Sequence, residues 1–187
     1  MSFVELRTPR LVLRRFTDSD LETFEAYRND PEISRYQSWE TFSHQEALEF
    51  ICEQKSLEPL VPGRWFQFAV ALMETQSLVG DCAVKVDEED TQQAEIGFTF
   101  AREHQGKGYA SEAVQRLLDF LFREAGLHRV VAITDCENQP AVALLERTGL
   151  RREGHFMQNV WFKGKWGDEY LYAILRSEWI QKHLASE

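Results

Sequence analysis

Apolar and polar residues alternate along the middle of the chain in the way that β-strands require. Residues 66–72 (FQFAVAL) alternate, a turn follows at residues 74–76, and a second apolar run covers residues 77–86. Beyond an acidic turn, residues 94–100 predict a third strand. The first two of these strands are expected to form a hairpin.

The N-terminal part predicts one strand followed by two short helices. Apolar residues place the strand at residues 10–16, and residues 18–19 cap a helix that ends near residues 29–31. Ser43 and Glu46 have the spacing of a capping box, so a second helix is expected to begin there. A cluster of proline and glycine ends this second helix.

The strongest helix pattern covers residues 110–121, where apolar residues recur every three or four positions. A short apolar run at residues 130–133 is typical of a buried strand, and a helix over residues 138–149 follows it. This strand–helix–strand–helix order predicts two parallel strands. The tail alternates again at residues 156–162 and 170–175, which predicts two further strands.

These elements combine into an α/β (mixed α+β) fold. We expect a mixed, mostly antiparallel sheet with a central parallel strand pair, flanked by helices. The length of 187 residues fits a single domain over residues 1–187. Hydrophobic residues make up 43% of the chain, which is enough for a core and excludes intrinsic disorder.

The excess of acidic residues limits the kinds of partner that the chain can bind. A formal net charge of -10 and a pI near 5.1 disfavour binding to nucleic acid or to an anionic membrane. The N-terminus lacks the apolar stretch of a secretory signal, and no segment approaches the roughly 20 apolar residues that span a bilayer. We therefore expect a cytoplasmic protein.

The cysteines and histidines predict neither a disulfide framework nor a metal site. Cys52, Cys82 and Cys136 are odd in number, far apart and in no CxxC arrangement. The five histidines are scattered, without HExxH or comparable spacing, so no metal is expected.

Residues 104–113 (HQGKGYASEA) carry the clearest candidate chemistry, because two glycines precede the strongest helix. The first amides of a helix lack internal acceptors and the helix dipole makes that end positive, so the segment can hold a diphosphate. Its spacing matches neither GxGxxG nor GxxxxGK[ST]. The alternative is an ordinary turn in which Gly106 and Gly108 serve geometry only. A second helix start, near residues 135–141, lies at the same predicted sheet edge and favours a ligand site.

Two of these segments form a longer pattern. Gln105-x-x-Gly108-x-Ala110 matches the motif Q/R-x-x-G-x-G/A, and Asn138 with residues 146–150 (ERTGL) resembles the segment N-x-x-S/A…E-K-x-G-F that follows it. In these motifs the chain resembles the GNAT superfamily of acyl-CoA-dependent N-acetyltransferases. Its RimJ- and RimL-type branch, ribosomal-protein N-terminal acetyltransferases, is similar in residues 8–14 (TPRLVLR), 30–33 (DPEI), 166–168 (WGD) and 171–172 (LY).

The resemblance implies a place for the cosubstrate acetyl-CoA. The strands at residues 95–100 and 130–134 would splay apart, with acetyl-CoA in the opening. Main-chain groups of the first strand would pair with the pantetheine amides, and the glycine-rich segment would meet the pyrophosphate. The cofactor-binding residues implied in this way are Phe98, Thr99, Phe100, Gln105, Gly106, Lys107, Gly108, Tyr109, Ala110 and Asn138.

The reaction implied by the resemblance is direct attack of a neutral amine on the thioester, without an acyl-enzyme. A carboxylate or histidine must accept the amine proton, and Glu95 is our candidate base because it begins the central strand. Many relatives place Ser or Tyr where this chain has Ala141 and Leu145, and neither side chain can donate a proton to the thiolate. The thiolate leaves unassisted or through water, Tyr170 or Tyr172 donates the proton, or catalysis is weak.

The resemblance also implies that the first two helices arch over the acceptor groove, which places Arg35, Tyr36 and Trp39 on the acceptor side. Aromatic residues at 65–66, 161 and 166 are further candidates. The predicted acceptor is a primary amine, either a ribosomal or other protein N-terminus or a small molecule. A catalytically silent acyl-CoA-binding module and a SAM- or nucleotide-dependent transferase are the alternatives, and a homodimer is left open.

Overall fold

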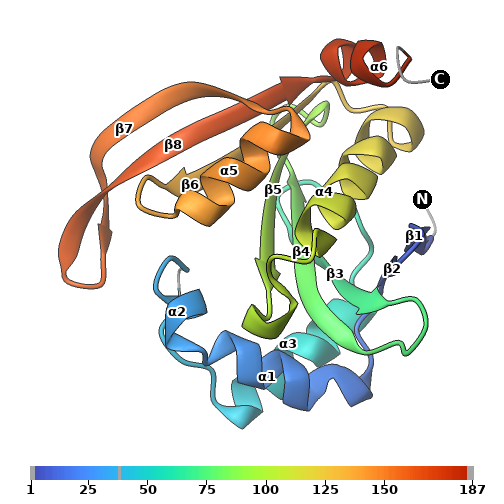
Figure 1. Ribbon diagram of the computed structural model, residues 1–187, viewed down its shortest axis with the longest axis vertical. Helices are drawn as coiled ribbons and strands as arrows, with labels where there is room; N and C mark the ends of the chain where they lie inside the picture. Colours follow the sequence, from blue (N-terminus) through green and yellow to red (C-terminus); the bar gives the residue numbers. More distant parts are fainter. Residues whose placement is uncertain (1–2, 38, 185–187) are drawn as a thin grey trace.

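The computed structural model describes residues 3–37 and 39–184, and one mixed sheet of eight strands organises them. The strand order is β1-β2-β3-β4-β5-β6-β8-β7 (Figure 1). All neighbours pair antiparallel except β5 and β6, which are parallel. The expected fold class, with a parallel pair at the centre, is confirmed.

The elements follow one another along the chain in this order. The strands are β1 (Leu6–Arg7), β2 (Leu11–Arg14), β3 (Trp65–Leu72), β4 (Leu78–Val86), β5 (Gln93–Phe100), β6 (Arg129–Asp135), β7 (Arg151–Phe162) and β8 (Lys165–Leu175). The helices are α1 (Leu21–Arg28), α2 (Pro31–Ser34), α3 (His44–Ser56), α4 (Tyr109–Asp119), α5 (Gln139–Thr148) and α6 (Arg176–Leu184), with 3₁₀ turns at Asp18–Asp20 and Arg102–His104 and a π-helical turn at Phe120–Glu124.

The parallel pair separates soon after it forms. Three residues of β5 are in register with β6, and the last of these pairs joins Glu95 to Val131. Both strands then continue, β5 to Phe100 and β6 to Asp135, without further pairing to each other in the described chain. The divergence opens an edge of β5 whose backbone groups have no partner strand, as the family resemblance implied.

Two apolar cores cover opposite faces of the sheet. The larger contains residues of α4 and α5 with one face of β3 to β6, and the smaller is formed by α1 and α3. Figure 1 shows α4 and α5 close to the diverging strands and α1 to α3 at the opposite end of the view. In α4 the buried residues are Ala113, Val114, Leu117 and Leu118, the stripe that the sequence pattern predicts.

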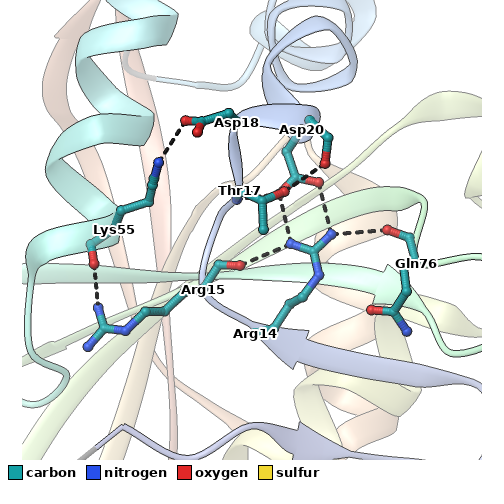
Figure 2. Close-up of polar contacts among 8 residues, drawn as sticks. Arg14, Arg15, Thr17, Asp18, Asp20, Lys55 and Gln76 are labelled. Atoms are coloured by element: carbon teal, nitrogen blue, oxygen red, sulfur yellow. Dashed lines mark hydrogen bonds and ion pairs between the residues drawn. The ribbon is translucent and has the colours of Figure 1, made fainter.

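A buried ion pair fixes the turn from β2 into α1. Arg14 donates to both carboxylate oxygens of Asp20, at 2.7 and 2.9 Å, and also to the carbonyl of Gln76 in the β3–β4 turn, at 3.0 Å (Figure 2). Nearby, Lys55 of α3 pairs with Asp18 at 2.7 Å. These contacts tie the first helix to the sheet. The apolar pattern of the sequence did not predict them, because the residues at 14 and 20 are charged.

Several predicted boundaries were wrong. The strand expected at residues 10–16 ends at Arg14, while β1, α2 and α6 were not predicted. Strands β7 and β8 begin five residues earlier than expected. The missed first part of β7, residues 151–155 (RREGH), lacks the apolar alternation on which the prediction depends, and α2 is only one turn long.

Candidate active site

A cavity lies beside the glycine-rich segment, where β5 and β6 diverge, and we call it the loop cavity. Its volume is about 360 Å³, and its walls come from β5, from residues 104–111 and from the start of α5. Nine of the ten residues implied to bind the cofactor line it: Phe98, Thr99, Phe100, Gln105, Gly106, Gly108, Tyr109, Ala110 and Asn138.

The N-terminus of α4 reaches the loop cavity without a side-chain cap. Gly108 is the N-cap residue, with a left-handed φ of 80° that glycine adopts without strain. Helix α5 differs, because its N-cap Asn138 accepts a hydrogen bond from the amide of Ala141 at 3.2 Å. The first amides of α4 therefore have no protein side chain competing with an anion.

Arg10 and Glu112 brace the glycine-rich segment. The Arg10 guanidinium donates to Glu112 at 2.6 Å and to the carbonyl of Lys107 at 3.0 Å, and Thr8 donates to Glu112 at 2.6 Å. Burial acts to raise the pKa of Glu112, but the hydrogen bonds from Thr8 and Arg10 outweigh it and lower the pKa. The sequence prediction missed this role, although Thr8 and Arg10 belong to the branch motif.

Three other predicted cofactor residues differ in the contacts they make within the protein. Gln105 donates to the carbonyl of Phe100 at 2.9 Å, which ties the segment to the end of β5. The Asn138 cap uses Oδ1 and does not engage the Nδ2 donor. Lys107 is exposed and lies outside the lining of the loop cavity, so its contact with phosphate stays a prediction.

A second cavity fills the gap between the diverging strands, and we call it the strand-gap cavity. It has a volume of about 220 Å³ and is lined by Ile96 to Phe98 of β5 and by Ala132 to Asp135 of β6. Ala141 and Leu145 of α5 also line it. The positions at which many GNAT relatives carry Ser or Tyr thus face this gap with alkyl side chains.

The tyrosines around the gap are placed differently from the sequence expectation. Tyr36 lines both the loop cavity and the strand-gap cavity. Tyr172 is fully buried and donates to Glu146 at 3.0 Å, and burial, then this hydrogen bond, raises its pKa to about 12. Neither Tyr170 nor Tyr172 lines either cavity. Among the tyrosines of the described residues, Tyr36 alone lines the strand-gap cavity.

A third cavity, the aromatic chamber, lies on the sheet face that α1 and α3 cover. Its volume is about 630 Å³, and Trp39, Phe42, Phe50 and Trp65 form its aromatic walls. Gly97, Phe98 and Thr99 of β5 also line it. Strand β5 therefore borders both the chamber and the strand-gap cavity.

Buried charged groups lie at the chamber wall. Asp81 accepts hydrogen bonds from Tyr27 at 2.5 Å and from Arg28 at 3.0 Å, and all three side chains are buried. Burial raises the pKa of Asp81, and the Arg28 charge opposes that rise. Burial, then the Asp81 charge, raises the pKa of the Tyr27 hydroxyl. Arg28 also stacks on Trp39, with its guanidinium carbon 3.9 Å from the ring centroid.

Two residues are shared by the walls of all three cavities. Gln37 and Phe98 each line the loop cavity, the strand-gap cavity and the aromatic chamber. Gln37 donates to the Thr99 hydroxyl at a long 3.5 Å. No sequence pattern marks Gln37, because its position depends on how the segment after α2 folds over β5.

Glu95, the predicted base, lies where β5 is still paired with β6. Its carboxylate pairs with Lys85 at 3.3 Å, and Glu95 lines none of the three cavities. Successive strand residues alternate in direction, so Glu95 shares a face of β5 with Gly97 and Thr99 of the aromatic chamber. Its catalytic role stays a prediction.

The predicted acceptor residues do not form one group. Tyr36 borders the gap and Trp39 lines the chamber, whereas exposed Arg35 lies 3.9 Å from Glu137 and lines no cavity described above. Trp161 and Trp166 pack edge to face on the β7–β8 hairpin, 60% and 55% exposed, and also lie outside these cavities.

The described residues contain no cluster of His, Cys, Asp or Glu that could hold a metal ion. None of their helices is long and apolar enough to cross a bilayer. Burial raises the pKa of the Cys136 thiol, and a hydrogen bond with Tyr170 opposes the rise, so this cysteine is not activated as a nucleophile.

This fold and this set of neighbouring cavities, which share wall residues, define an α/β protein that can hold one extended ligand across a sheet opening and a second ligand beside it. The family model for the acetyltransferase (GNAT) domain matches residues 10–151. The chain belongs to the GNAT acetyltransferases, and its relatives are N-acetyltransferases.

Individual relatives agree with this assignment. YnaD of Bacillus subtilis, which is named an uncharacterized N-acetyltransferase, is 34% identical over 94% of this chain and 99% of its own length. A GNAT acetyltransferase structure from Bacillus anthracis has a TM-score of 0.84 and 32% identity, covering 93% of this chain and 99% of that one. A Vibrio cholerae spermidine N-acetyltransferase solved with CoA and spermine has a TM-score of 0.78 and 26% identity, covering 92% and 99%.

The predicted branch also has a structural neighbour. RimL, a ribosomal L7/L12 alpha-N-protein acetyltransferase solved with coenzyme A, has a TM-score of 0.80 and 20% identity, covering 92% of this chain and 98% of that one. At this identity the likeness shows a shared fold.

Proposed function

We propose that this chain transfers an acetyl group from acetyl-CoA to a primary amine, either a protein N-terminal α-amine or a small-molecule amine, in a ternary complex. The observation that supports this proposal is that Gln37 and Phe98 line all three cavities, so the cavities lie next to one another at these two residues. A thioester entering from the loop cavity and an amine entering from another cavity can meet there. The neutral nitrogen attacks the thioester carbon, the C–N bond forms, the C–S bond breaks, and the thiolate leaves.

Acetyl-CoA fits the chemistry of the loop cavity. The uncapped amides at the start of α4 suit a pyrophosphate, and the Nδ2 donor of Asn138 suits a pantetheine carbonyl. The unpaired edge of β5 from Ile96 to Phe100 suits the pantetheine amides, which would extend the sheet as an added strand does. Holding both reactants in one place supplies much of the rate.

Protonation of the departing thiolate is assigned to Tyr36 in this proposal. Its presence in the walls of both cavities near the gap supports the assignment, as do the alkyl side chains at Ala141 and Leu145. A Tyr36→Phe variant is expected to lower kcat by up to about 100-fold, the low end for general acid catalysis, because a thiolate is a good leaving group. Acetyl-CoA affinity, measured by calorimetry, is expected to stay nearly unchanged.

Tyr170→Phe is the matched comparison for Tyr36→Phe, because Tyr170 is the competing donor from the tail. A loss of kcat in Tyr170→Phe with wild-type kcat in Tyr36→Phe would contradict the assignment. Equal, wild-type rates in both variants would mean that the thiolate leaves without a tyrosine.

Glu95 is proposed as the base, acting through water, because it shares a strand face with Gly97 at the chamber. Glu95→Gln is expected to lower kcat about 100-fold, the low end for general base catalysis, and to remove the acidic limb of the pH–rate profile, while the Kd of acetyl-CoA stays nearly constant. Lys85→Met, which removes the partner of Glu95, controls for the loss of the ion pair. A wild-type pH–rate profile for Glu95→Gln would discard Glu95 as the base.

Release of CoA from acetyl-CoA tests the proposed function as a whole. A panel of primary amines, including a polyamine, peptides with free N-termini and small monoamines, is expected to contain at least one acceptor whose acetylated product is found by mass spectrometry. The alternative, a silent acyl-CoA-binding module, is motivated by Ala141 and Leu145. It predicts tight acetyl-CoA binding with no product from any amine.

A further inference from the structure

The aromatic chamber is large enough to hold a small molecule beside the reaction centre. Its volume of about 630 Å³ lies within the roughly 300–1,000 Å³ typical of small-molecule pockets. It shares the lining residues Gln37 and Phe98 with the other two cavities, so a ligand at that end of the chamber would lie next to the strand gap.

The ionisable groups that line the chamber compensate one another. Asp81 faces Arg28 at 3.0 Å and Glu53 faces Arg64 at 3.4 Å. No carboxylate in this lining is left without a guanidinium, although the whole chain carries a net charge of -10. A ligand with several ammonium groups requires uncompensated carboxylates, and this chamber does not supply them.

The faces of the two tryptophans already carry cations of the chain itself. The guanidinium of Arg28 lies 3.9 Å from the centroid of the Trp39 ring, and the ammonium of Lys85 lies 4.8 Å from that of Trp65. An ammonium tail approaching these rings for a cation–π contact would meet these like charges. The chamber lining also contains uncharged apolar side chains, among them Phe98 and Leu57, which offer contact area to an uncharged ring.

The chamber walls are held in place before any ligand binds. The indole N–H of Trp39 donates to the carbonyl of Arg28 at 3.0 Å. The Asn29 amide bridges both backbone groups of Phe42, each at 2.8 Å. Walls fixed in this way bind a rigid planar ligand with little further loss of conformational freedom.

We infer that the chamber is the acceptor site and that the acceptor is a small primary monoamine carried on an aromatic or similarly bulky apolar body. This inference rests on the proposed function and names its substrate class. The amine would lie at the Gln37 and Phe98 end, with the apolar body between Trp39 and Trp65. Polyamines and peptide N-termini are the competing acceptors.

The test measures kcat/KM by CoA release with 2-phenylethylamine, spermidine and an alanine-initiated peptide as separate acceptors. The phenylethylamine value is expected to exceed each of the other two at least tenfold. A spermidine or peptide value equal to or above it overturns the inference and leaves the proposed function standing. CoA release with none of the amines, while calorimetry detects acetyl-CoA binding, overturns the proposed function itself.

A substitution in the lining of the aromatic chamber tests whether the aromatic acceptor binds there. Trp65→Ala is expected to lower kcat/KM for 2-phenylethylamine about tenfold, mainly through KM, with an unchanged Kd for acetyl-CoA. Phe156→Ala is the matched control, because Phe156 is 40% exposed, as Trp65 is 36% exposed, and lines none of the three cavities. Equal losses in both variants, or no loss in Trp65→Ala, would overturn the assignment of the chamber.

Discussion

Gly108→Glu is expected to weaken acetyl-CoA binding about 1,000-fold in a calorimetric titration. Gly108 caps α4 at the wall of the loop cavity, where the pyrophosphate is proposed to lie. A carboxylate about 4 Å from a phosphate charge at an effective dielectric constant near 20 costs about 4 kcal/mol. That free energy corresponds to about three orders of magnitude in Kd. The bulk of the side chain would add to this loss.

Gly126→Glu is the matched control for backbone strain and added charge. Gly126 has a φ of 76°, close to the 80° of Gly108, and a Cβ there meets no atom within 4 Å. It lies after α4 and lines none of the three cavities. We expect this variant to bind acetyl-CoA normally. Equal weakening in both variants would indicate misfolding, and unchanged affinity in Gly108→Glu would mean that the pyrophosphate lies elsewhere.

Local patterns were sufficient to predict the central part of this fold. The hairpin of β3 and β4, the amphipathic α4 and the capping box of α3 follow from spacing alone, and each was found. The divergence of β5 and β6 depends on long-range pairing, and here the family resemblance supplied what periodicity could not.

The candidate site was predictable where contiguous sequence forms it. Residues 105–110 lie in one loop and can be identified from a motif, and the residues of β5 follow from their place before it. Other site residues make hydrogen bonds to partners more than 50 residues away in sequence: Arg10 to Lys107, Arg28 to Asp81 and Gln37 to Thr99. Such contacts leave no local signal, so the acceptor side could be described only with the structure.

Arg28→Met is expected to lower the free energy of unfolding by about 3–5 kcal/mol, because it leaves the Asp81 carboxylate buried without a cation. Urea denaturation followed by circular dichroism measures this change. Methionine keeps most of the side-chain bulk, so the loss reports charge more than packing. Arg64→Ala removes an exposed partner of Glu53 and is expected to change stability by less than about 1 kcal/mol.

The loss of stability in Arg28→Met is expected to grow as the pH rises. Burial raises the pKa of Asp81, and removing Arg28 removes the charge that opposes this rise. A carboxyl with a raised pKa binds its proton more tightly in the folded state, so stability falls as pH rises toward the folded pKa. The variant should therefore lose more stability relative to the wild type at pH 8 than at pH 5. Adding Asp81→Asn should restore much of the stability and remove the pH dependence, whereas a double variant as unstable as the single one would exclude the uncompensated carboxylate as the cause.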